Sequence, residues 1–257
     1  MMNDQEKFLF DLQGFICVPD ALTKQQISTL NEILDTHIAG DMTAEARTQR
    51  WGGLLTWGQA YVDVLDNPTL MPYLDEILGK NFRLDHDYAD LIRTSLEPGK
   101  PVAGPIGNML HGGATPYDPS QYYHFADGRM HNGLTVVAYN LCDIGEQDGG
   151  FGCVPGSHKS NYRFPHEWRD LNQTEMQPFV RKVGGPAGNA IIFSEALTHG
   201  TLPWFGAGER RTLFFKYSPF PLSWSARYYN PADYPGLTEA QQALLEAPNA
   251  RYRGRKA

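Results

Sequence analysis

The sequence predicts a mainly β fold, a sandwich or barrel, with helices at its flanks. From residue 82 onward, short β-prone segments alternate with turns rich in glycine and proline. Strands separated in this way are typical of sandwiches and barrels rather than of strand–helix–strand units. The expected strands cover residues 82–94, 134–141, 151–154, 179–183, 190–193 and 211–218. The sequence has no internal repeat or low-complexity linker, so we expect a single domain over residues 1–257.

Helices are expected on both sides of this β-rich region. After a β-prone run over residues 14–18, Thr23 is a helix N-cap whose reciprocal partner is Gln26. An apolar stripe at helical spacing follows, formed by Ile27, Leu30, Ile33 and Leu34. A second helix is expected over residues 69–78. The expected order is therefore N-terminal helices to about residue 80, a core over about 82–220 and a late helix over about 237–246.

The charge balance limits the classes of partner. The chain has 22 Lys and Arg residues against 29 Asp and Glu residues, a net charge of -7 at pH 7. Binding to nucleic acid or to an anionic membrane is driven by basic clusters that release counterions. The one basic stretch, residues 251–256, is expected to be a solvated chain end. We therefore expect a small-molecule partner, and neither nucleic acid nor a membrane.

Cysteine usage and the N-terminus indicate the compartment. Cys17, Cys142 and Cys153 are too few and too scattered for a disulfide framework or a cysteine-rich zinc site. The polar N-terminus lacks the apolar region of a signal peptide, and no apolar run approaches the length that spans a bilayer. These features predict a cytoplasmic protein with reduced thiols.

Two histidines are the strongest candidates for metal ligands. His111 opens a His-Gly-Gly run, and His199 follows the apolar strand over residues 190–193. Non-haem Fe(II) enzymes hold the metal with two histidines and one carboxylate, and the opposite coordination positions stay open. A jelly roll can bring residues that are distant in sequence onto neighbouring inward-facing strands. The position two residues after His111, where His-x-Asp would supply the carboxylate, is Gly113.

Several segments occur together in one order. They are the N-terminal strand followed by a helix, the run from Asp148-Gly149-Gly150 to Pro155-Gly156-Ser157-His158, then His199-Gly200, and then Glu209-Arg210-Arg211. Over about residues 8–220 this order resembles the phytanoyl-CoA dioxygenase-like family of Fe(II)/2-oxoglutarate oxygenases. The resemblance implies a double-stranded β-helix (cupin-like jelly roll), with Fe(II), 2-oxoglutarate and O₂ as metal and co-substrates. It also implies oxidation of a C–H bond in a small molecule, by hydroxylation or a related reaction.

Two arginines could bind the distal carboxylate of 2-oxoglutarate. Arg210 and Arg211 lie 11 and 12 residues after His199, and a planar guanidinium pairs with a carboxylate in bidentate fashion. Adjacent strand residues face opposite sides, so only one of the two points inward. We favour Arg211, because it shares a face with Leu213, Phe215 and Tyr217. The spacing common in the family is also compatible with Arg210.

The absent carboxylate has three explanations. Another acid could complete the triad, with Glu195, Asp85 and Asp87 as candidates. Alternatively, Gly113 leaves a coordination position open for chloride, as in related 2-oxoglutarate-dependent halogenases, because an Asp side chain and a halide cannot occupy the same space. In the third explanation, the protein is a non-catalytic, cupin-like binder of a small molecule or metal. We place hydroxylation-type oxidation first and halogenation second, and we expect His158 to be a hydrogen-bonding turn residue rather than a ligand.

Overall fold

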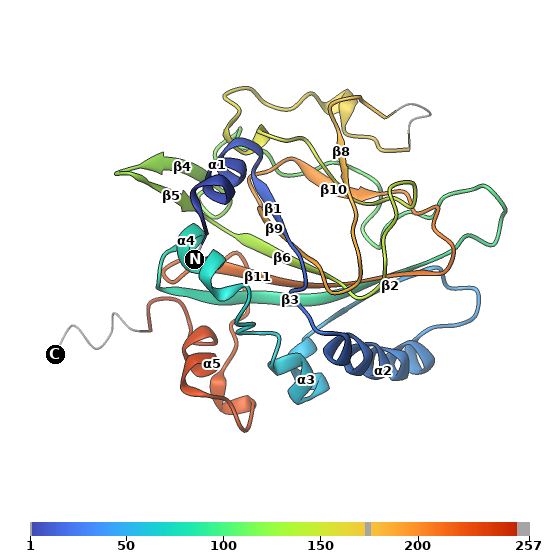
Figure 1. Ribbon diagram of the computed structural model, residues 1–257, viewed down its shortest axis with the longest axis horizontal. Helices are drawn as coiled ribbons and strands as arrows, with labels where there is room; N and C mark the ends of the chain where they lie inside the picture. Colours follow the sequence, from blue (N-terminus) through green and yellow to red (C-terminus); the bar gives the residue numbers. More distant parts are fainter. Residues whose placement is uncertain (1, 173–175, 251–257) are drawn as a thin grey trace.

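Two antiparallel sheets face each other in a double-stranded β-helix (Figure 1), which confirms the predicted jelly roll. The computed structural model describes residues 2–172 and 176–250, so the basic stretch at 251–256 lies outside the described residues. The large sheet has the strand order β1-β9-β6-β11-β3-β2, and the small sheet has the order β10-β7-β8. A separate hairpin pairs β4 with β5. No helix in the described part of the chain is long and apolar enough to cross a membrane.

The strands follow the predicted segments, with additions. The large sheet consists of β1 (Phe15–Val18), β2 (Thr48–Gly52), β3 (Phe82–Arg93), β6 (Thr135–Asn140), β9 (Ala190–Ser194) and β11 (Glu209–Pro219). The small sheet consists of β7 (Gly150–Cys153), β8 (Arg181–Val183) and β10 (His199–Leu202), and the hairpin of β4 (Tyr123–Ala126) and β5 (Arg129–Asn132). Because β1 and β2 form the two edges of the large sheet, the β core begins well before residue 82, where the sequence pattern had placed its start.

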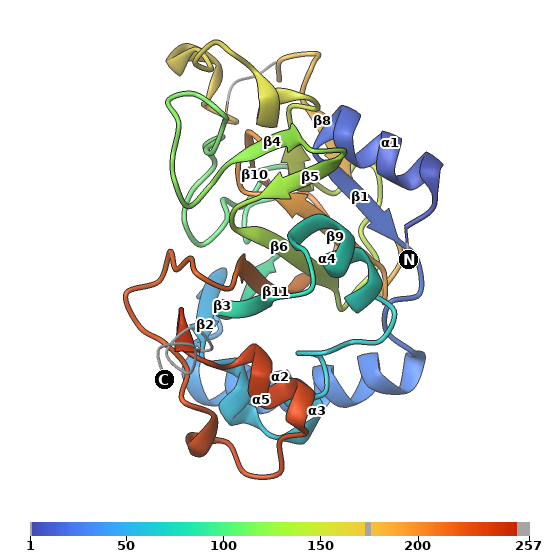
Figure 2. The ribbon, with the colours of Figure 1, turned by 90° about the vertical axis from the view of Figure 1, so that its left-hand side faces the viewer.

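Five α-helices flank the sheets in the described residues. They are α1 (Asp4–Gln13), α2 (Lys24–Asp41), α3 (Gln59–Val62), α4 (Met71–Leu78) and α5 (Glu239–Leu244). The Thr23 hydroxyl accepts from the Gln26 amide, and the Gln26 side chain accepts from the Thr23 amide, so the predicted capping box starts α2. Figure 2 shows α2, α3 and α5 gathered on the side of the large sheet that faces away from the small sheet.

Residues along β11 alternate between two hydrophobic cores, because successive strand side chains point to opposite faces. One core lies between the large sheet and the helices, and it contains Leu213, Phe215 and Tyr217. The other lies between the two sheets and contains Phe214, with Phe151 of β7 and Phe193 of β9. The face of β11 that lines the interior of the jelly roll therefore carries residues 210, 212, 214 and 216.

A β-bulge in β3 holds the chain that follows β11. The register between β3 and β11 shifts between Lys216 and Tyr217, and Asp85 is the residue without a partner. The fully buried Asp85 carboxylate accepts from the backbone amides of Trp224 at 2.9 Å and Ser225 at 3.0 Å. It also pairs with the buried guanidinium of Arg83 at 3.3 Å. Asp85 thus fixes the segment after β11 against β3.

Replacing Asp85 with alanine should destabilise the protein by about 3–5 kcal/mol, because Arg83 would stay buried without its partner. Urea unfolding of Asp85→Ala and wild type measures this difference. Glu97→Ala, which removes the exposed pair with Lys100, is the matched control and should change stability by less than about 1 kcal/mol. Equal effects of the two substitutions would contradict a structural role for Asp85.

Candidate metal centre

The structure brings His111 and His199 side by side. Their backbones exchange two hydrogen bonds, from His111 N to His199 O at 2.8 Å and from His199 N to His111 O at 2.9 Å. The centroids of their imidazole rings are 4.3 Å apart. His199 is the first residue of β10, and this bridge continues the small sheet beyond β10 to the segment that contains His111.

Both imidazoles present the nitrogen that a metal would need. Nδ1 of His199 lies 2.7 Å from the carbonyl oxygen of Leu197, and Nδ1 of His111 lies 3.3 Å from that of Met109. A carbonyl oxygen only accepts, so each Nδ1 carries the hydrogen and each Nε2 keeps a free lone pair. Burial, and then the neighbouring His111, lower the pKa of His199 to about 3. His199 is therefore neutral at physiological pH, which is the form that binds metals.

Glu195 supplies a carboxylate to this pair. Its ligand oxygen and the nitrogens of His111 and His199 all lie within 4.8 Å of one another. Oε2 of Glu195 is 3.9 Å from Nε2 of His199. Burial alone would raise the pKa of Glu195, but the ammonium of Lys216 and then His199 pull that pKa down to about 2. Within residues 2–172 and 176–250, no other group of three His, Cys, Asp or Glu side chains has a geometry that could hold a metal.

Asp85 and Asp87, the other acids proposed for the triad, lie elsewhere. Asp85 binds the segment after β11, and Asp87 belongs to the helical side of the large sheet. Its cross-strand partner on β11 is Phe215, which belongs to the core beneath the helices. Its carboxylate accepts from the Leu54 amide at 2.6 Å and from the Tyr229 hydroxyl at 2.7 Å. The prediction of Asp87 as a ligand is therefore wrong: the side chain points away from the histidines and anchors two loops on the helical side.

Gly113 is required by the backbone. Its φ is +113°, a conformation that strains residues with a Cβ, and an added Cβ would lie 3.2 Å from Oγ1 of Thr198. At Gly112, with φ +76°, an added Cβ would overlap the carbonyl oxygen of Leu197. The chain thus turns sharply after His111. This turn gives the glycine at position 113 a backbone role.

The two arginines have different surroundings, and the prediction that Arg211 points into the interior of the jelly roll is wrong. Arg211 does share a face with Leu213, Phe215 and Tyr217, but this face packs against the helices. Its guanidinium donates to Glu209 at 2.6 Å and 2.8 Å, to Asp35 of α2 at 2.7 Å and to Asn31 of α2 at 3.0 Å. Arg211 therefore ties β11 to α2.

Arg210 points into the interior of the jelly roll. It is 2% exposed, and its Nε and Nη1 are buried without a hydrogen-bond partner. Oγ1 of Thr212 and Nδ2 of Asn140 are among the other buried groups of the described residues that lack a partner, and these two residues are cross-strand neighbours. Buried polar groups left unpaired cost free energy. The three residues could therefore donate hydrogen bonds to a ligand with several acceptor atoms.

Within residues 2–172 and 176–250, the charges on this interior face leave Arg210 without a counter-ion. Asp90 of β3, the acid that acts most strongly on the pKa of Arg210, is held by Arg50 through two hydrogen bonds of 2.6 Å and 2.7 Å. Glu195 is paired with Lys216. Burial lowers the pKa of Arg210, with the Asp90 charge acting against it. One positive charge thus remains uncompensated between the sheets, which favours an anionic ligand.

Four features of this interior face were not predicted from the sequence: Lys216, Thr212, Asn140 and the pair of Arg50 with Asp90. A signal for the first two was present in β11. Its odd-numbered positions from 213 to 217 are all apolar, while positions 210, 212 and 216 are polar or charged. In a strand that is buried on both faces, a polar face marks the side that meets a ligand or a charged partner.

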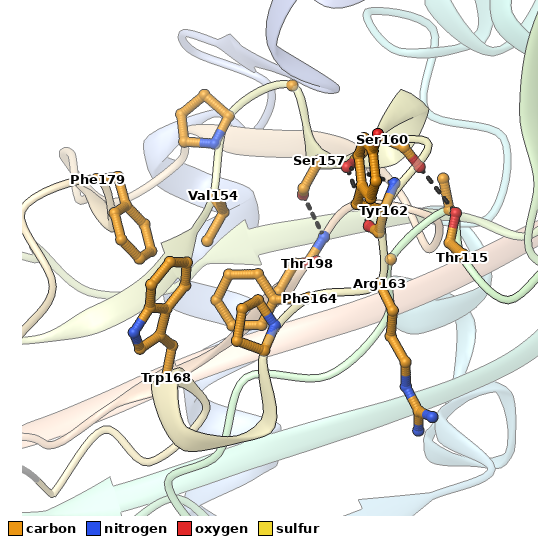
Figure 3. Close-up of a pocket in the computed structure, with 15 residues that line it drawn as sticks. Thr115, Val154, Ser157, Ser160, Tyr162, Arg163, Phe164, Trp168, Phe179 and Thr198 are labelled. Carbon is orange, nitrogen blue, oxygen red and sulfur yellow. Dashed lines mark hydrogen bonds between the residues drawn. The ribbon is translucent and has the colours of Figure 1, made fainter.

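An aromatic pocket of 520 Å³ lies near the histidines, on the outer side of the small sheet. Figure 3 shows Phe164, Trp168 and Phe179 clustered along one wall and Arg163 extending away from them. Val154 and Phe164 pack on the outer face of the small sheet. Thr198, whose amide donates to the Ser157 hydroxyl at 2.7 Å, is the pocket residue next to His199. The backbone of the small sheet therefore separates this pocket from the metal-facing side of the histidines.

The profile of one protein family, Phytanoyl-CoA dioxygenase (PhyH), matches residues 10–212. No curated protein sequence matches the chain. Among solved structures, HygX from Streptomyces hygroscopicus with nickel and 2-oxoglutarate bound is similar, with a TM-score of 0.75 and 21% identity over 87% of this chain and 89% of that one.

Two further structures share the fold. HygX with nickel, 2-oxoglutarate and hygromycin B bound has a TM-score of 0.73 and 22% identity, over 91% of this chain and 95% of that one. AviO1 from Streptomyces viridochromogenes Tue57 has a TM-score of 0.60 and 17% identity, over 86% of this chain and 96% of that one. At these identities, the likeness establishes the common fold.

His158 lies apart from the metal-ligand cluster. It is fully buried, its Nε2 lies 3.0 Å from the carbonyl oxygen of Asp11, and the ring of Tyr123 packs edge-on against it at 4.6 Å. Burial lowers the pKa of His158 to about 4. This side chain is a neutral hydrogen-bonding turn residue, as the sequence pattern predicted.

His158 should make stability depend on pH. In the unfolded chain His158 binds a proton near pH 6.5, whereas in the folded chain it does so only near pH 4. The free energy of unfolding therefore decreases as the pH falls from 6.5 to 4. The expected loss is about 3 kcal/mol. Urea unfolding at pH 7 and pH 4 should show a flatter profile for His158→Gln than for wild type. The exposed His166 provides the control: His166→Gln should leave the profile unchanged, and an equal slope in His158→Gln would refute the assignment.

Proposed function

Since this chain belongs to the phytanoyl-CoA dioxygenase family, we propose that it is a non-haem Fe(II)/2-oxoglutarate-dependent oxygenase acting on a C–H bond of a small molecule. The observation that carries this proposal is the pairing of two features inside one jelly roll. One is the His111, Glu195 and His199 cluster. The other is the uncompensated guanidinium of Arg210 between the same two sheets.

Fe(II) fits the first feature. Two imidazole Nε2 atoms and one carboxylate oxygen are the donor set of the facial triad, which leaves the opposite positions free for a co-substrate and O₂. When bound, iron and 2-oxoglutarate would supply the oxidising power, drawn from O₂, that breaks the C–H bond. The protein orients the donors: the Nδ1 contacts fix both imidazoles, and the rings of Phe151 and Phe193 pack against His199 at 6.0 Å and 4.7 Å.

2-Oxoglutarate fits the second feature. Its distal carboxylate would accept from the Arg210 guanidinium and from the Thr212 hydroxyl, and it would neutralise the unpaired charge. Asn140 Nδ2 offers a third donor. Gly150 of the small sheet lies beside this guanidinium, because a Cβ added there would be in van der Waals contact with Nε of Arg210, at 3.7 Å. The 2-oxoglutarate in the HygX structures supports this assignment, since those proteins share the fold.

We infer hydroxylation-type oxidation ahead of halogenation. Glu195 offers the carboxylate that the sequence lacks after His111, and the turn explains the glycine at position 113. The non-catalytic alternative is less favoured, because a binder would not need both the triad and a buried arginine without a counter-ion. The partner is proposed to be a small molecule, and one domain is proposed to contain the whole site, since β1 and β2 join the same sheet as β11.

Anaerobic titration with Fe(II) and 2-oxoglutarate tests the proposal. Wild type should develop the visible charge-transfer absorbance of the chelate. In Arg210→Met, the Kd for 2-oxoglutarate should rise about ten- to a hundred-fold, because a charge-assisted contact worth about 1.5–3 kcal/mol is lost. Arg211→Met is the matched control, which should lower stability but leave this Kd unchanged. A larger effect on the Kd in Arg211→Met would overturn the assignment of Arg210.

Chloride discriminates between the two oxidations. If Glu195 fills the third position, Glu195→Ala should weaken Fe(II) binding at least about ten- to a hundred-fold, and chloride should leave the wild-type chelate absorbance unchanged. The Kd for Fe(II) and the visible spectrum test these two expectations. Succinate release and product analysis across a panel of small molecules, with chloride or bromide present, identify the reaction. Intact Fe(II) binding in Glu195→Ala, together with halogenated product from wild type, would favour the halogenase.

A further inference from the structure

Lys216 is the one cation that contacts the acid of the cluster among the described residues. Its Nζ pairs with Oε1 of Glu195, and their side chains are 12% and 5% exposed. Lys216 lies on β11 between Val136 of β6 and His86 of β3, well inside the large sheet. The backbone of Lys216 is therefore held by a neighbouring strand on each side.

The two oxygens of Glu195 face different partners. Oε1 is taken by Lys216, whereas Oε2 lies 3.9 Å from Nε2 of His199. A carboxylate in which one oxygen accepts from an ammonium has only the other oxygen available for a metal. The Lys216 ammonium also lies over the ring of Tyr88, 5.4 Å from its centroid. This arrangement limits how Glu195 can rotate.

We propose that Lys216 is a positioning residue that holds Glu195 as a one-oxygen metal donor. This inference rests on the proposed function, because it assumes that the cluster binds iron. A glutamate in a turn has more rotatable bonds than the aspartate of a His-x-Asp strand, so it needs an external restraint to keep one geometry. With Oε1 occupied, the carboxylate cannot chelate through both oxygens, and a coordination position stays open for the co-substrate or O₂.

Lys216 also changes the charge around the metal. A two-histidine, one-carboxylate site reduces the charge of a divalent ion by one unit. The ammonium of Lys216 compensates the charge of Glu195, so the surroundings of the metal stay one unit more positive. Such a site favours anionic co-substrates and weakens the hold on the cation itself. Removing the ammonium should therefore raise the metal affinity, which distinguishes this role from a purely structural one.

Co(II) binding to purified Lys216→Met tests the role. Without the ammonium, both Glu195 oxygens become available and a nearby positive charge disappears. Co(II) affinity should therefore rise about ten-fold, and its visible d–d spectrum should shift as the carboxylate becomes bidentate. Binding of 2-oxoglutarate to the Fe(II) protein should weaken, and succinate formation should fall about ten-fold or more. A residue that only supports the fold would lower metal affinity and activity together and leave the spectrum unchanged.

Two further variants complete the test. Lys216→Gln keeps a donor for Oε1 without the charge, so Co(II) affinity should rise while the spectrum stays that of wild type; it also serves if the methionine variant does not fold. Lys7→Met removes the surface pair with Glu76 and should behave as wild type. A wild-type spectrum in Lys216→Met, or a shifted one in Lys216→Gln, overturns the positioning role. Wild type that binds neither Co(II) nor Fe(II) refutes the proposed function itself.

Discussion

The backbone bridge between His111 and His199 is the contact on which the candidate centre depends. Two hydrogen bonds between main chains fix the distance between the segments, whatever their side chains do. Because the bridge holds both residues in one register, both imidazoles project to the same side. The turn between β9 and β10 then needs only a few residues to bring Glu195 to the same place. A metal would meet donors that the fold has already oriented.

Charge pairing organises the rest of the interior. Arg50 with Asp90, and Lys216 with Glu195, are neutral pairs on the inner face of the large sheet, and Arg210 is the charge that remains. Buried charges persist where partners or ligands compensate them. The interior therefore has two chemical zones, a cluster of metal donors and a region that accepts an anion. Phe214 lies between Arg210 and Lys216 along β11 and belongs to the apolar core between the two sheets.

Much of this arrangement could be predicted from the sequence, because it depends on local patterns. The capping box at Thr23, the alternation in β11 and the two histidines all have short-range signals. The choice between Arg210 and Arg211 has no short-range signal, because alternation defines two faces of the strand. Only the position of the helices decides which face is interior. The orientation of Asp87 depends on the same tertiary information. Lys216 escaped notice because a single lysine in a strand usually indicates a solvent-facing position.

The bulge at Asp85 gives the C-terminal region a mechanical connection to the centre. Arg83 donates to the carbonyl of Glu246 at 3.0 Å beyond α5 and also pairs with Asp85. Asp85 contacts His86, and His86 is the cross-strand neighbour of Lys216. Shortening the chain near residue 246, or fusing a bulky partner there, would disturb the contact between Glu246 and Arg83. Because Arg83, Asp85 and His86 are linked, the change could displace Lys216 beside Glu195. Distant edits at the carboxyl terminus would then be expected to alter catalysis without touching any ligand.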